Sequence, residues 1–460
     1  MDWNLKKYPM YYGGVKQTYP KVKPGVPFLS KSAVVGNIIF LSGSVGRSSE
    51  TGKVTSDKFE EQLIVCLDNV RLALEEAGSS MDNLVKNFII IKDMPDYPLM
   101  WKTMLDYYQK HAPSLVEEPP AITATEVSTL ADPDCLVELD SIAVVSKDAP
   151  GWETKKYPMY YGGVKQVYPN IEPGMPFLSE SVAVGNLLFL SGMAGENPNT
   201  GRIETNVFEE QMDIALDKVR TAMDRPGSSM SNIIKTLHFQ TGLESLLAEG
   251  KDTSQSYSPA SDRLWKSELW YYEKYAPFLL EEFPASTFMK VTSLASPASL
   301  GQTDVTGVIS RYRPGWRVKN YPCYLAKRGF PRHIGDIKKY YANCVAVGNL
   351  IFFSGQCPFD PITGRFETDV FEEQMIIALD NLRAGMEEAG SSLENLVKTH
   401  MLLPNPENYT SMRRIELEYY QKYAPPLVDE PPASTVIHLL KLAAPNLLIE
   451  IDAIGVIPES

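Results

Sequence analysis

One stretch recurs three times in this chain and first reads Val35-Gly36-Asn37-Ile38-Ile39-Phe40-Leu41-Ser42-Gly43. It returns as Val184-Gly185-Asn186-Leu187-Leu188-Phe189-Leu190-Ser191-Gly192 and as Val347-Gly348-Asn349-Leu350-Ile351-Phe352-Phe353-Ser354-Gly355. After each copy come a Thr-Gly turn and the motif Phe-Glu-Glu-Gln, which begins at Phe59, Phe208 and Phe371. The chain of 460 residues therefore consists of three copies of one domain, which we expect to span 1–148, 149–312 and 313–460.

Composition excludes several classes of function. Apolar residues make up 44% of the chain, and no apolar run approaches the roughly 18 residues of a membrane span. The net charge of −13 argues against a nucleic-acid binder, because neutralising a phosphate backbone requires a basic face. Five cysteines at irregular spacing and the lack of an apolar signal core at 1–10 favour a reduced cytoplasmic chain. We therefore expect a cytoplasmic protein without a membrane, metal or cofactor.

Hydrophobic periodicity predicts the same α+β module in each copy. In the first copy, 32–41 reads as two strands joined at Gly36-Asn37, a two-residue hairpin signal. Residues 59–78 have helical spacing and end on a glycine. A strand over 84–92, a helix over 98–111 and strands over 123–130 and 136–145 complete a sheet with helices on one face. The helix N-cap candidates in the three copies are Ser56, Thr205 and Thr368.

The copies differ in their arms and in one insert. Each arm is irregular and begins at a tryptophan (Trp3, Trp152 or Trp316), and we expect these aromatic residues to pack on a neighbouring domain. The third arm, at 323–339, is divergent and basic. The second copy carries an insert at about 244–261, rich in Ser, which is typical of a solvated loop. The arms and the insert are also the candidate surfaces for a protein partner.

The order of motifs in each copy is specific. It runs Gly-Asn-x-x-x-x-Ser-Gly, Thr-Gly, a helix followed by Gly-Ser-Ser, and a final apolar strand that carries Glu-x-Asp in the first and third copies. This order resembles the Rid (YjgF-type) reactive-intermediate deaminase family, whose members resemble chorismate mutase in fold. They form homotrimers with a small-molecule cleft at each subunit interface. The resemblance implies that this chain is an intramolecular pseudo-trimer and hence monomeric, with its three domains held together at high effective concentration.

The resemblance also implies what a working cleft contains. Deaminating members hydrolyse 2-imino or enamine acids: an arginine binds the substrate carboxylate and a glutamate on the last strand activates water, roles that suit both groups. The arginine follows the Pro-Ala step before the fourth strand, where this chain has Ile122, Ser286 and Ser434. Loss of the charged partner of a buried carboxylate costs about 2–5 kcal/mol, or roughly 30- to several thousand-fold in binding. We therefore expect ordinary imino-acid deamination to be lost.

Other positions implied to form the clefts have diverged less evenly. The glutamate is Glu138 in the first copy and Glu450 in the third, but Gln302 in the second, so at least one cleft is expected to be inactive. Glu138 and Glu450 are the candidate catalytic residues, or else partners in an interface hydrogen-bond network. The residues implied to bind ligand are Ser42, Ser191, Ser354 and Tyr341. The serines are equally suited to a role in strand packing.

The second helix supplies the residue at the mouth of each cleft, which is Trp101, Trp265 and Arg413 in the three copies. The tryptophans are expected to close their clefts. Arg413 is a candidate handle for an anionic ligand, or else a solvated arginine on the helix surface. Strand periodicity places His438 on the same face as Ser434, and this pair is a candidate for chemistry or ligand binding, although strand histidines are often structural.

Three functions are compatible with the sequence. The first is a Rid-like pseudoenzyme that has lost standard 2-imino acid deaminase activity and binds a small metabolite at inter-domain clefts. The second is an active imine or enamine hydrolase for a substrate without the usual carboxylate, with Glu450 or Glu138 as base. The third is a non-catalytic scaffold, which predicts clefts filled by side chains. Ribonuclease activity, also described in the family, is disfavoured by the acidic charge.

Overall fold

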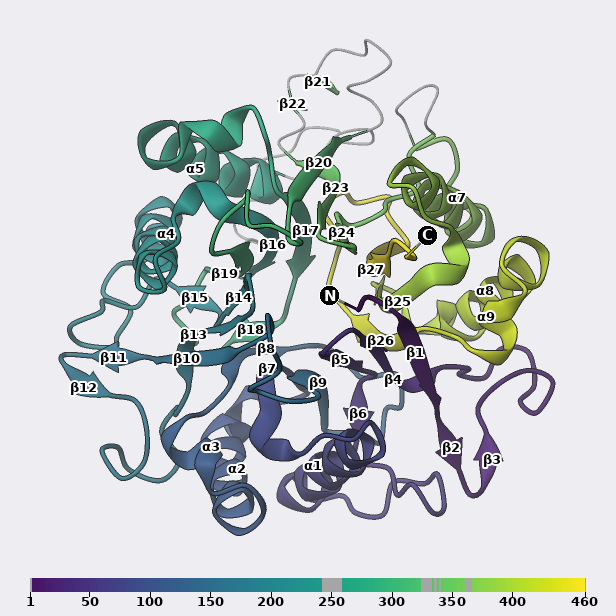
Figure 1. Cartoon of the computed structure of the whole chain (residues 1–460), viewed down its shortest axis with the longest axis horizontal. Coiled ribbons are helices and arrows are strands. Elements are labelled where there is room, and N and C mark those ends of the chain that lie inside the picture. Colours follow the sequence, from purple (N-terminus) through teal and green to yellow (C-terminus); the bar gives the residue numbers. More distant parts are fainter. Residues whose placement is uncertain are drawn as a thin grey trace.

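The computed structural model describes residues 2–241, 259–323, 333–334, 337–338, 341–360 and 366–459. Over these residues the chain forms a ring in which strands surround the centre and helices lie outside (Figure 1). This is the intramolecular α+β pseudo-trimer that the triplicated sequence predicts. We call 1–148, 149–312 and 313–460 the first, second and third repeats.

The first repeat alternates short arm strands, a hairpin and two helix-strand units. Its strands are β1 (Leu5–Pro9), β2 (Tyr11–Tyr12), β3 (Val15–Lys16), β4 (Ser30–Val35), β5 (Ile38–Leu41), β6 (Ser44–Val45), β7 (Leu84–Ile91), β8 (Ala121–Glu126) and β9 (Val137–Val144). Its helices are α1 (Phe59–Glu76), α2 (Tyr97–His111) and α3 (Ser114–Glu117), with 3-10 turns η1 (Met81–Asn83) and η2 (Met94–Asp96). Helix α1 packs on the sheet because Leu63, Leu67 and Leu74 recur at helical spacing on its buried face.

The second repeat follows the same order. Its strands are β10 (Thr154–Pro158), β11 (Tyr160–Tyr161), β12 (Val164–Lys165), β13 (Ser179–Val184), β14 (Leu187–Leu190), β15 (Met193–Ala194), β16 (Ile233–Gln240), β17 (Ala285–Lys290), β18 (Ser293–Leu294) and β19 (Gly301–Val308). Its helices are α4 (Phe208–Asp224) and α5 (Pro259–Tyr275), with 3-10 turns η3 (Met230–Asn232) and η5 (Pro277–Leu280).

The third repeat has the same order of strands and helices. Its strands are β20 (Val318–Pro322), β21 (His333–Ile334), β22 (Ile337–Lys338), β23 (Ala342–Val347), β24 (Leu350–Phe353), β25 (Leu396–Leu403), β26 (Ala433–His438) and β27 (Glu450–Val456). Its helices are α7 (Phe371–Glu388), α8 (Tyr409–Tyr423) and α9 (Pro426–Asp429), with 3-10 turns η6 (Leu393–Asn395) and η7 (Pro406–Asn408).

Most predicted elements are confirmed, but one predicted strand begins and ends earlier than expected. The β4/β5 hairpin turns at Gly36 with φ +58°, and Gly78 follows α1 with φ +79°, so glycine is needed at both positions. The strand predicted over 123–130 instead runs from Ala121 to Glu126. It pairs in parallel with β7 and ends opposite Ile91, where β7 also ends. Ile122 therefore lies inside β8.

The predicted N-caps are wrong in position. Each first helix begins after an N-cap residue (Lys58, Val207 or Val370) whose side chain makes no capping hydrogen bond. The predicted hydroxyls act one step earlier: Ser56, Thr205 and Thr368 each accept a hydrogen bond from the backbone N–H two residues on, at 3.1–3.2 Å. They stabilise the turn that leads into the helix, because a Ser or Thr hydroxyl satisfies local backbone donors in turns as well as at caps.

Over the described residues, the repeats join edge to edge into one 21-stranded sheet. Within the first repeat, β7 lies between β8, to which it is parallel, and β9, to which it is antiparallel. Between repeats, parallel pairings link β8 to β13, β17 to β23 and β26 to β4. The last of these brings the third repeat against the first, so the sheet closes into a ring.

Three arm tryptophans meet at the centre of this ring. Trp3, Trp152 and Trp316 are buried and contact one another edge-on, with ring centroids 4.6–5.1 Å apart. Trp152 covers Gly36 of the first repeat so closely that a Cβ there would lie 2.7 Å from the indole. The expectation that these tryptophans pack on neighbouring domains is confirmed.

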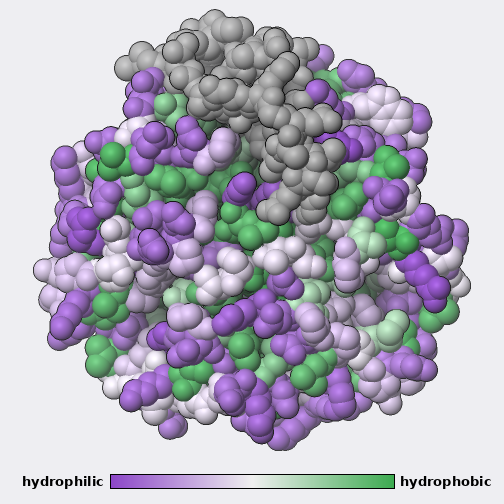
Figure 2. All heavy atoms as spheres, turned by 180° about the vertical axis from the view of Figure 1, so that it is seen from behind, coloured by the Kyte–Doolittle hydropathy of each residue, from purple (hydrophilic) through white to green (hydrophobic). Residues whose placement is uncertain are grey.

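The rest of the described surface is unexceptional. Figure 2 shows hydrophilic residues interspersed with small apolar areas on the opposite face of the ring, as on most protein surfaces. Within the described ranges, no helix has the length and apolar character needed to cross a membrane. The expected insert at about 244–261 and the divergent arm at 323–339 lie largely outside the described residues.

Candidate functional site

Each repeat interface places a serine and the implied glutamate position of one repeat against the fourth strand of its neighbour. We use the name cleft 1/3 for the interface region where Ser42 and Glu138 of the first repeat lie against Arg413 and Ser434 of the third, all of them buried, and name the other two regions in the same way. Cleft 2/1 contains Ser191 and Gln302 of the second repeat, with Trp101 and Ile122 of the first. Cleft 3/2 contains Ser354 and Glu450 of the third repeat, with Trp265 and Ser286 of the second. Backbone hydrogen bonds of 3.2–3.3 Å from Gly43, Gly192 and Gly355 to Ser434, Ile122 and Ser286, respectively, define the three interfaces.

The cleft serines make the same contacts in all three interfaces. The hydroxyl of Ser42 accepts a hydrogen bond of 2.8 Å from the backbone N–H of Ser434 and donates to the carbonyl of Ser30. Ser191 and Ser354 repeat this pattern with Ile122 and Ser286, also at 2.8 Å. Since each hydroxyl proton already serves a strand contact, these serines join the repeats. Their role in ligand binding stays a prediction.

Arg413 is buried in cleft 1/3, with 2% of its surface exposed, and is not a solvated surface arginine. Its Nη1 donates to Glu416 Oε2 at 2.8 Å, and its Nη2 lies 3.4 Å from Ser434 Oγ. Its Nε is buried and has no hydrogen-bond partner among the described residues. The guanidinium thus enters from helix α8 and reaches the strand position where the implied arginine is missing.

Glu138 lies in the same cleft and is 5% exposed. Burial, followed by the charge of Asp140, raises its pKa to about 8, against the opposing effects of Lys398, His400 and Arg413. Its Oε2 has no hydrogen-bond partner in the described part of the chain. A Cβ at Gly43 would collide with this carboxyl group, so the Ser-Gly step gives Glu138 room against the backbone. At neutral pH Glu138 is mostly a protonated acid, not a carboxylate.

Cleft 3/2 has a comparable glutamate but lacks an arginine among its described residues. Burial and then Asp452 raise the pKa of Glu450 to about 8, and a Cβ at Gly355 would collide with its carboxyl group. Trp265 is 5% exposed at the position of Arg413. Ser286 Oγ accepts a hydrogen bond of 3.0 Å from Thr236.

Cleft 2/1 is the most diverged. Trp101 is 1% exposed and packs edge-on against Phe177 of the neighbouring arm, with centroids 5.3 Å apart, and against Tyr97 at 5.7 Å. The side chain of Gln302, which replaces the glutamate, is buried. Trp101 and Trp265 are both buried, and their closing of the clefts stays a prediction.

The structure does not join Ser434 to His438. His438 is buried, and its Nδ1 lies 3.3 Å from the carbonyl of Leu403. Burial lowers the pKa of His438 to about 4, so the ring is neutral. Ser434 Oγ is contacted by Thr399 at 3.2 Å and by Arg413. Among the described residues, no hydrogen bond links this serine to this histidine. Their shared strand face alone does not make a catalytic pair.

Tyr341 lies half-buried immediately before β23. Its place in a cleft stays a prediction. No group of three or more His, Cys, Asp and Glu side chains in the described ranges is arranged to hold a metal ion.

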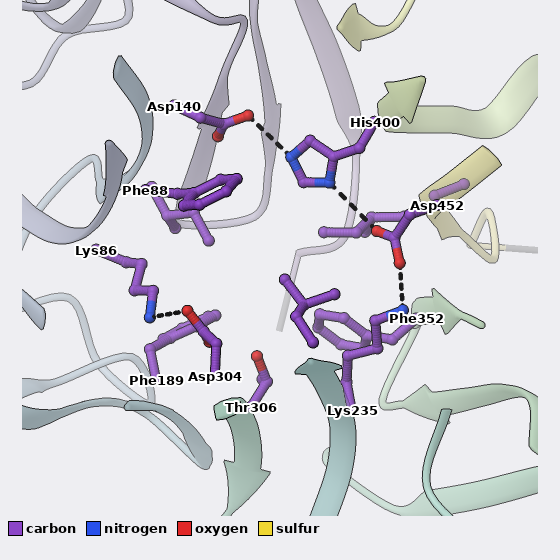
Figure 3. A pocket seen from close by; sticks show the side chains of 14 residues that line it. Lys86, Phe88, Asp140, Phe189, Lys235, Asp304, Thr306, Phe352, His400 and Asp452 are labelled. Atoms are coloured by element: carbon purple, nitrogen blue, oxygen red, sulfur yellow. Dashed lines mark hydrogen bonds and ion pairs between the residues drawn. The ribbon is translucent and has the colours of Figure 1, made fainter. Parts of the chain in front are cut away.

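A charged cluster that the motif comparison missed lies where the three repeats meet around the centre. Three ion pairs connect the repeats: Lys86 with Asp304, Lys235 with Asp452, and Lys398 with Asp140. Five of these six side chains, all but Lys398, line a cavity of about 80 Å³ together with His400 and apolar side chains such as Phe88, Phe189 and Phe352 (Figure 3). The third residue of β7, β16 and β25 is lysine in all three repeats. A lysine repeated inside a buried strand is the signal from which the cluster can be found.

Comparison with known proteins agrees with the triplication. The family described as "Endoribonuclease L-PSP" matches residues 21–145, 170–299 and 333–457. A RutC family protein of Pyrococcus abyssi is 35% identical over 121 residues, which are 26% of this chain and 88% of that protein. The 2-iminobutanoate/2-iminopropanoate deaminase of Escherichia coli is 31% identical over 110 residues, 24% of this chain and 81% of that protein. The solved YjgF gene product of E. coli is 27% identical and covers 30% of this chain and 98% of its own, with a TM-score of 0.25.

Proposed function

Because this chain belongs to the endoribonuclease L-PSP (Rid) family, we propose that cleft 1/3 binds a small anionic metabolite and that standard 2-imino acid deaminase activity is lost. The observation that carries the proposal is the buried guanidinium of Arg413, whose Nε lacks a partner in the described chain. An unsatisfied buried donor costs about 1–3 kcal/mol. A ligand that accepts from Nε removes this cost.

The geometry of Arg413 favours a planar anion such as a carboxylate. Glu416 engages Nη1, one N–H of Nη2 points to Ser434, and the Tyr409 ring lies 5.6 Å from the guanidinium carbon, so the donors left for a ligand are Nε and the second N–H of Nη2. Two parallel N–H donors on one edge match the two oxygens of a carboxylate. Glu138, with a pKa of about 8, is protonated at neutral pH. It therefore does not repel an anion and can donate a hydrogen bond to it.

The other two clefts are proposed not to bind such ligands. Trp101 and Trp265 occupy the position of Arg413 and are buried. At the strand position of the missing arginine these clefts carry Ile122 and Ser286. Neither side chain is cationic, so neither can replace the ion pair with a carboxylate.

Binding is tested by calorimetric titration of the purified chain with 2-oxobutanoate, a stable 2-oxo acid. We expect saturable binding that weakens at least about 30-fold in Arg413→Trp, because a buried charge partner is lost. Arg414→Ala is the matched control: Arg414 follows on the same helix, its side chain is 42% exposed, and it pairs with Glu418. Equal binding by wild type and Arg413→Trp contradicts the proposal.

A second candidate, hydrolysis of an imine or enamine, is favoured by the pKa of about 8 of both Glu138 and Glu450. A carboxyl group that titrates near the working pH is suited to general acid-base catalysis. The test is turnover of 2-iminobutanoate and 2-iminopropanoate, generated in situ, by wild type, Glu138→Gln and Glu450→Gln. We expect no turnover above background by any of the three proteins. Turnover that disappears in either variant assigns catalysis to that glutamate and overturns the proposed loss.

A further inference from the structure

His400 stands out in the central cluster because both of its ring nitrogens face carboxylates. Its Nε2 lies 2.9 Å from Asp140 Oδ2 and its Nδ1 lies 3.3 Å from Asp452 Oδ1 (Figure 3). An ionised carboxylate only accepts hydrogen bonds, and a neutral imidazole has a single N–H. Both contacts are therefore hydrogen bonds only when the ring carries two protons. The geometry fits an imidazolium.

The cluster places this imidazolium at one interface only. Asp140 belongs to the first repeat, whereas His400 and Asp452 belong to the third. At the position of His400 the first repeat has Phe88 and the second has Leu237, each the fifth residue of its strand. All three interfaces share a Lys–Asp pair. The added histidine contact therefore distinguishes the interface between the first and third repeats.

That interface differs from the other two in connectivity. The chain passes directly from the first repeat to the second and from the second to the third. The first and third repeats are joined only through non-covalent contacts, such as the β26–β4 pairing. We call this interface the 1/3 seam. Because no chain segment links these two repeats directly, only non-covalent contacts oppose the opening of the seam.

The lysines in the cluster do not serve as ligand donors. Lys86 donates to Thr123, Leu190 and Asp304. Lys235 and Lys398 make the same three kinds of contact. An ammonium group has three protons, and all three are used. The cavity thus offers little to an anionic ligand, and its charges serve to join the repeats.

We propose that His400 is a proton-dependent clasp that closes the 1/3 seam: with two protons the charged ring donates to Asp140 across the seam while Asp452 holds it from within its own repeat, and with one proton the ring loses its charge and one of these hydrogen bonds. This inference is independent of what cleft 1/3 binds. The charged and titratable groups around the ring are Lys398, Asp140, Glu138, Asp452, Glu450, Lys235, Lys86 and Asp304.

The charges around His400 favour its doubly protonated form. Burial lowers the pKa of His400, but Asp140 and then Asp452 raise it, and the net pKa lies above the ordinary value of 6.5. Although burial raises the pKa of both aspartates, their cationic neighbours hold it well below the usual range. The stabilisation from His400 is therefore fully present below pH 6.5 and is lost as pH rises through the pKa of the folded state.

Hydrogen exchange tests the clasp with controls inside the same molecule. The backbone N–H of Ser434 donates to Ser42 across the 1/3 seam, and those of Ile122 and Ser286 donate at the two chain-linked interfaces, all at 2.8 Å. Protection factors for peptides covering these amides are measured from pH 6 to pH 9 and corrected for intrinsic exchange. We expect protection at Ser434 to fall about tenfold relative to the other two, as befits loss of a charge-assisted hydrogen bond.

Variants identify the responsible group. His400→Leu and His400→Phe carry the residues found at this position in the other repeats, and both should remove the relative pH dependence at Ser434. His111→Ala, on the exposed end of α2, should retain it. Equal pH dependence at all three interfaces in wild type, or an unchanged fall at Ser434 in either His400 variant, overturns the proposal. An equal pH dependence at all three interfaces in wild type overturns the proposal even if a variant fails to fold.

Discussion

At the residue scale, the positions that set the chemistry are buried carboxyl groups whose pKa lies near neutrality. Glu138 and Glu450 each lie beside an aspartate two residues on along the same strand, and burial is the main reason that their pKa rises to about 8. Ser434 and Arg413 complete cleft 1/3 from the other repeat. Cleft 1/3 thus holds one carboxyl group with a raised pKa, Glu138, close to the cations Lys398, His400 and Arg413.

A pH dependence of stability follows for Glu138. Its ordinary pKa is 4.5 and its folded pKa is about 8, so between these values the unfolded state has released a proton that the folded state keeps. The free energy of unfolding therefore falls as pH rises through this window. Urea denaturation should find Glu138→Gln close to wild type at pH 5 and more stable than wild type at pH 9. A variant less stable than wild type at pH 9 contradicts the protonated state.

The residue scale also shows where sequence reasoning stops. The missing arginine and the diverged glutamate were evident because each is one position in a motif. The burial of Arg413 was not evident from the sequence. Arg413 lies on a helix turn, and the exposure of that turn depends on the arm of another repeat. Gly25 of the first arm lies against Thr410 at the start of α8. Contacts between repeats decide such positions, and local spacing does not encode them.

At the scale of elements, the arms close the ring through their tryptophans. Trp3, Trp152 and Trp316 fill the centre in mutual edge-on contact. Periodicity predicted the first helix, the hairpin and the second helix well, because each buries one apolar face. It misplaced the N-caps, since a hydroxyl that stabilises a preceding turn looks the same in sequence as one that caps the helix.

Truncating a central tryptophan should therefore destabilise the whole ring. Trp152→Ala removes a buried side chain that contacts both other tryptophans and Gly36, and such losses cost about 3–5 kcal/mol. Trp270→Ala is the matched control, because Trp270 is 51% exposed and surface changes usually stay within about 0.5 kcal/mol. Chemical denaturation measures the free energy of unfolding of both variants. Similar losses in the two variants contradict the central role of the tryptophan cluster.

At the scale of the whole molecule, fusion allows the three interfaces to differ. Two clefts carry buried tryptophans, one carries Arg413, and only the 1/3 seam has His400 among the described residues. The triplication and the fold could be predicted from repeated motifs alone. The central cluster could not, because each ion pair joins residues of two repeats and His400 has no counterpart in a motif.

We propose that a small carboxylate binds in cleft 1/3 and in neither of the other two clefts. The most direct measurement is a crystal structure of the chain at saturating 2-oxobutanoate. We expect one ligand per chain, with its carboxylate against Nε and Nη2 of Arg413 and within hydrogen-bond reach of Glu138. A ligand in cleft 2/1 or cleft 3/2, or an unliganded cleft 1/3 at saturating concentration, would contradict it.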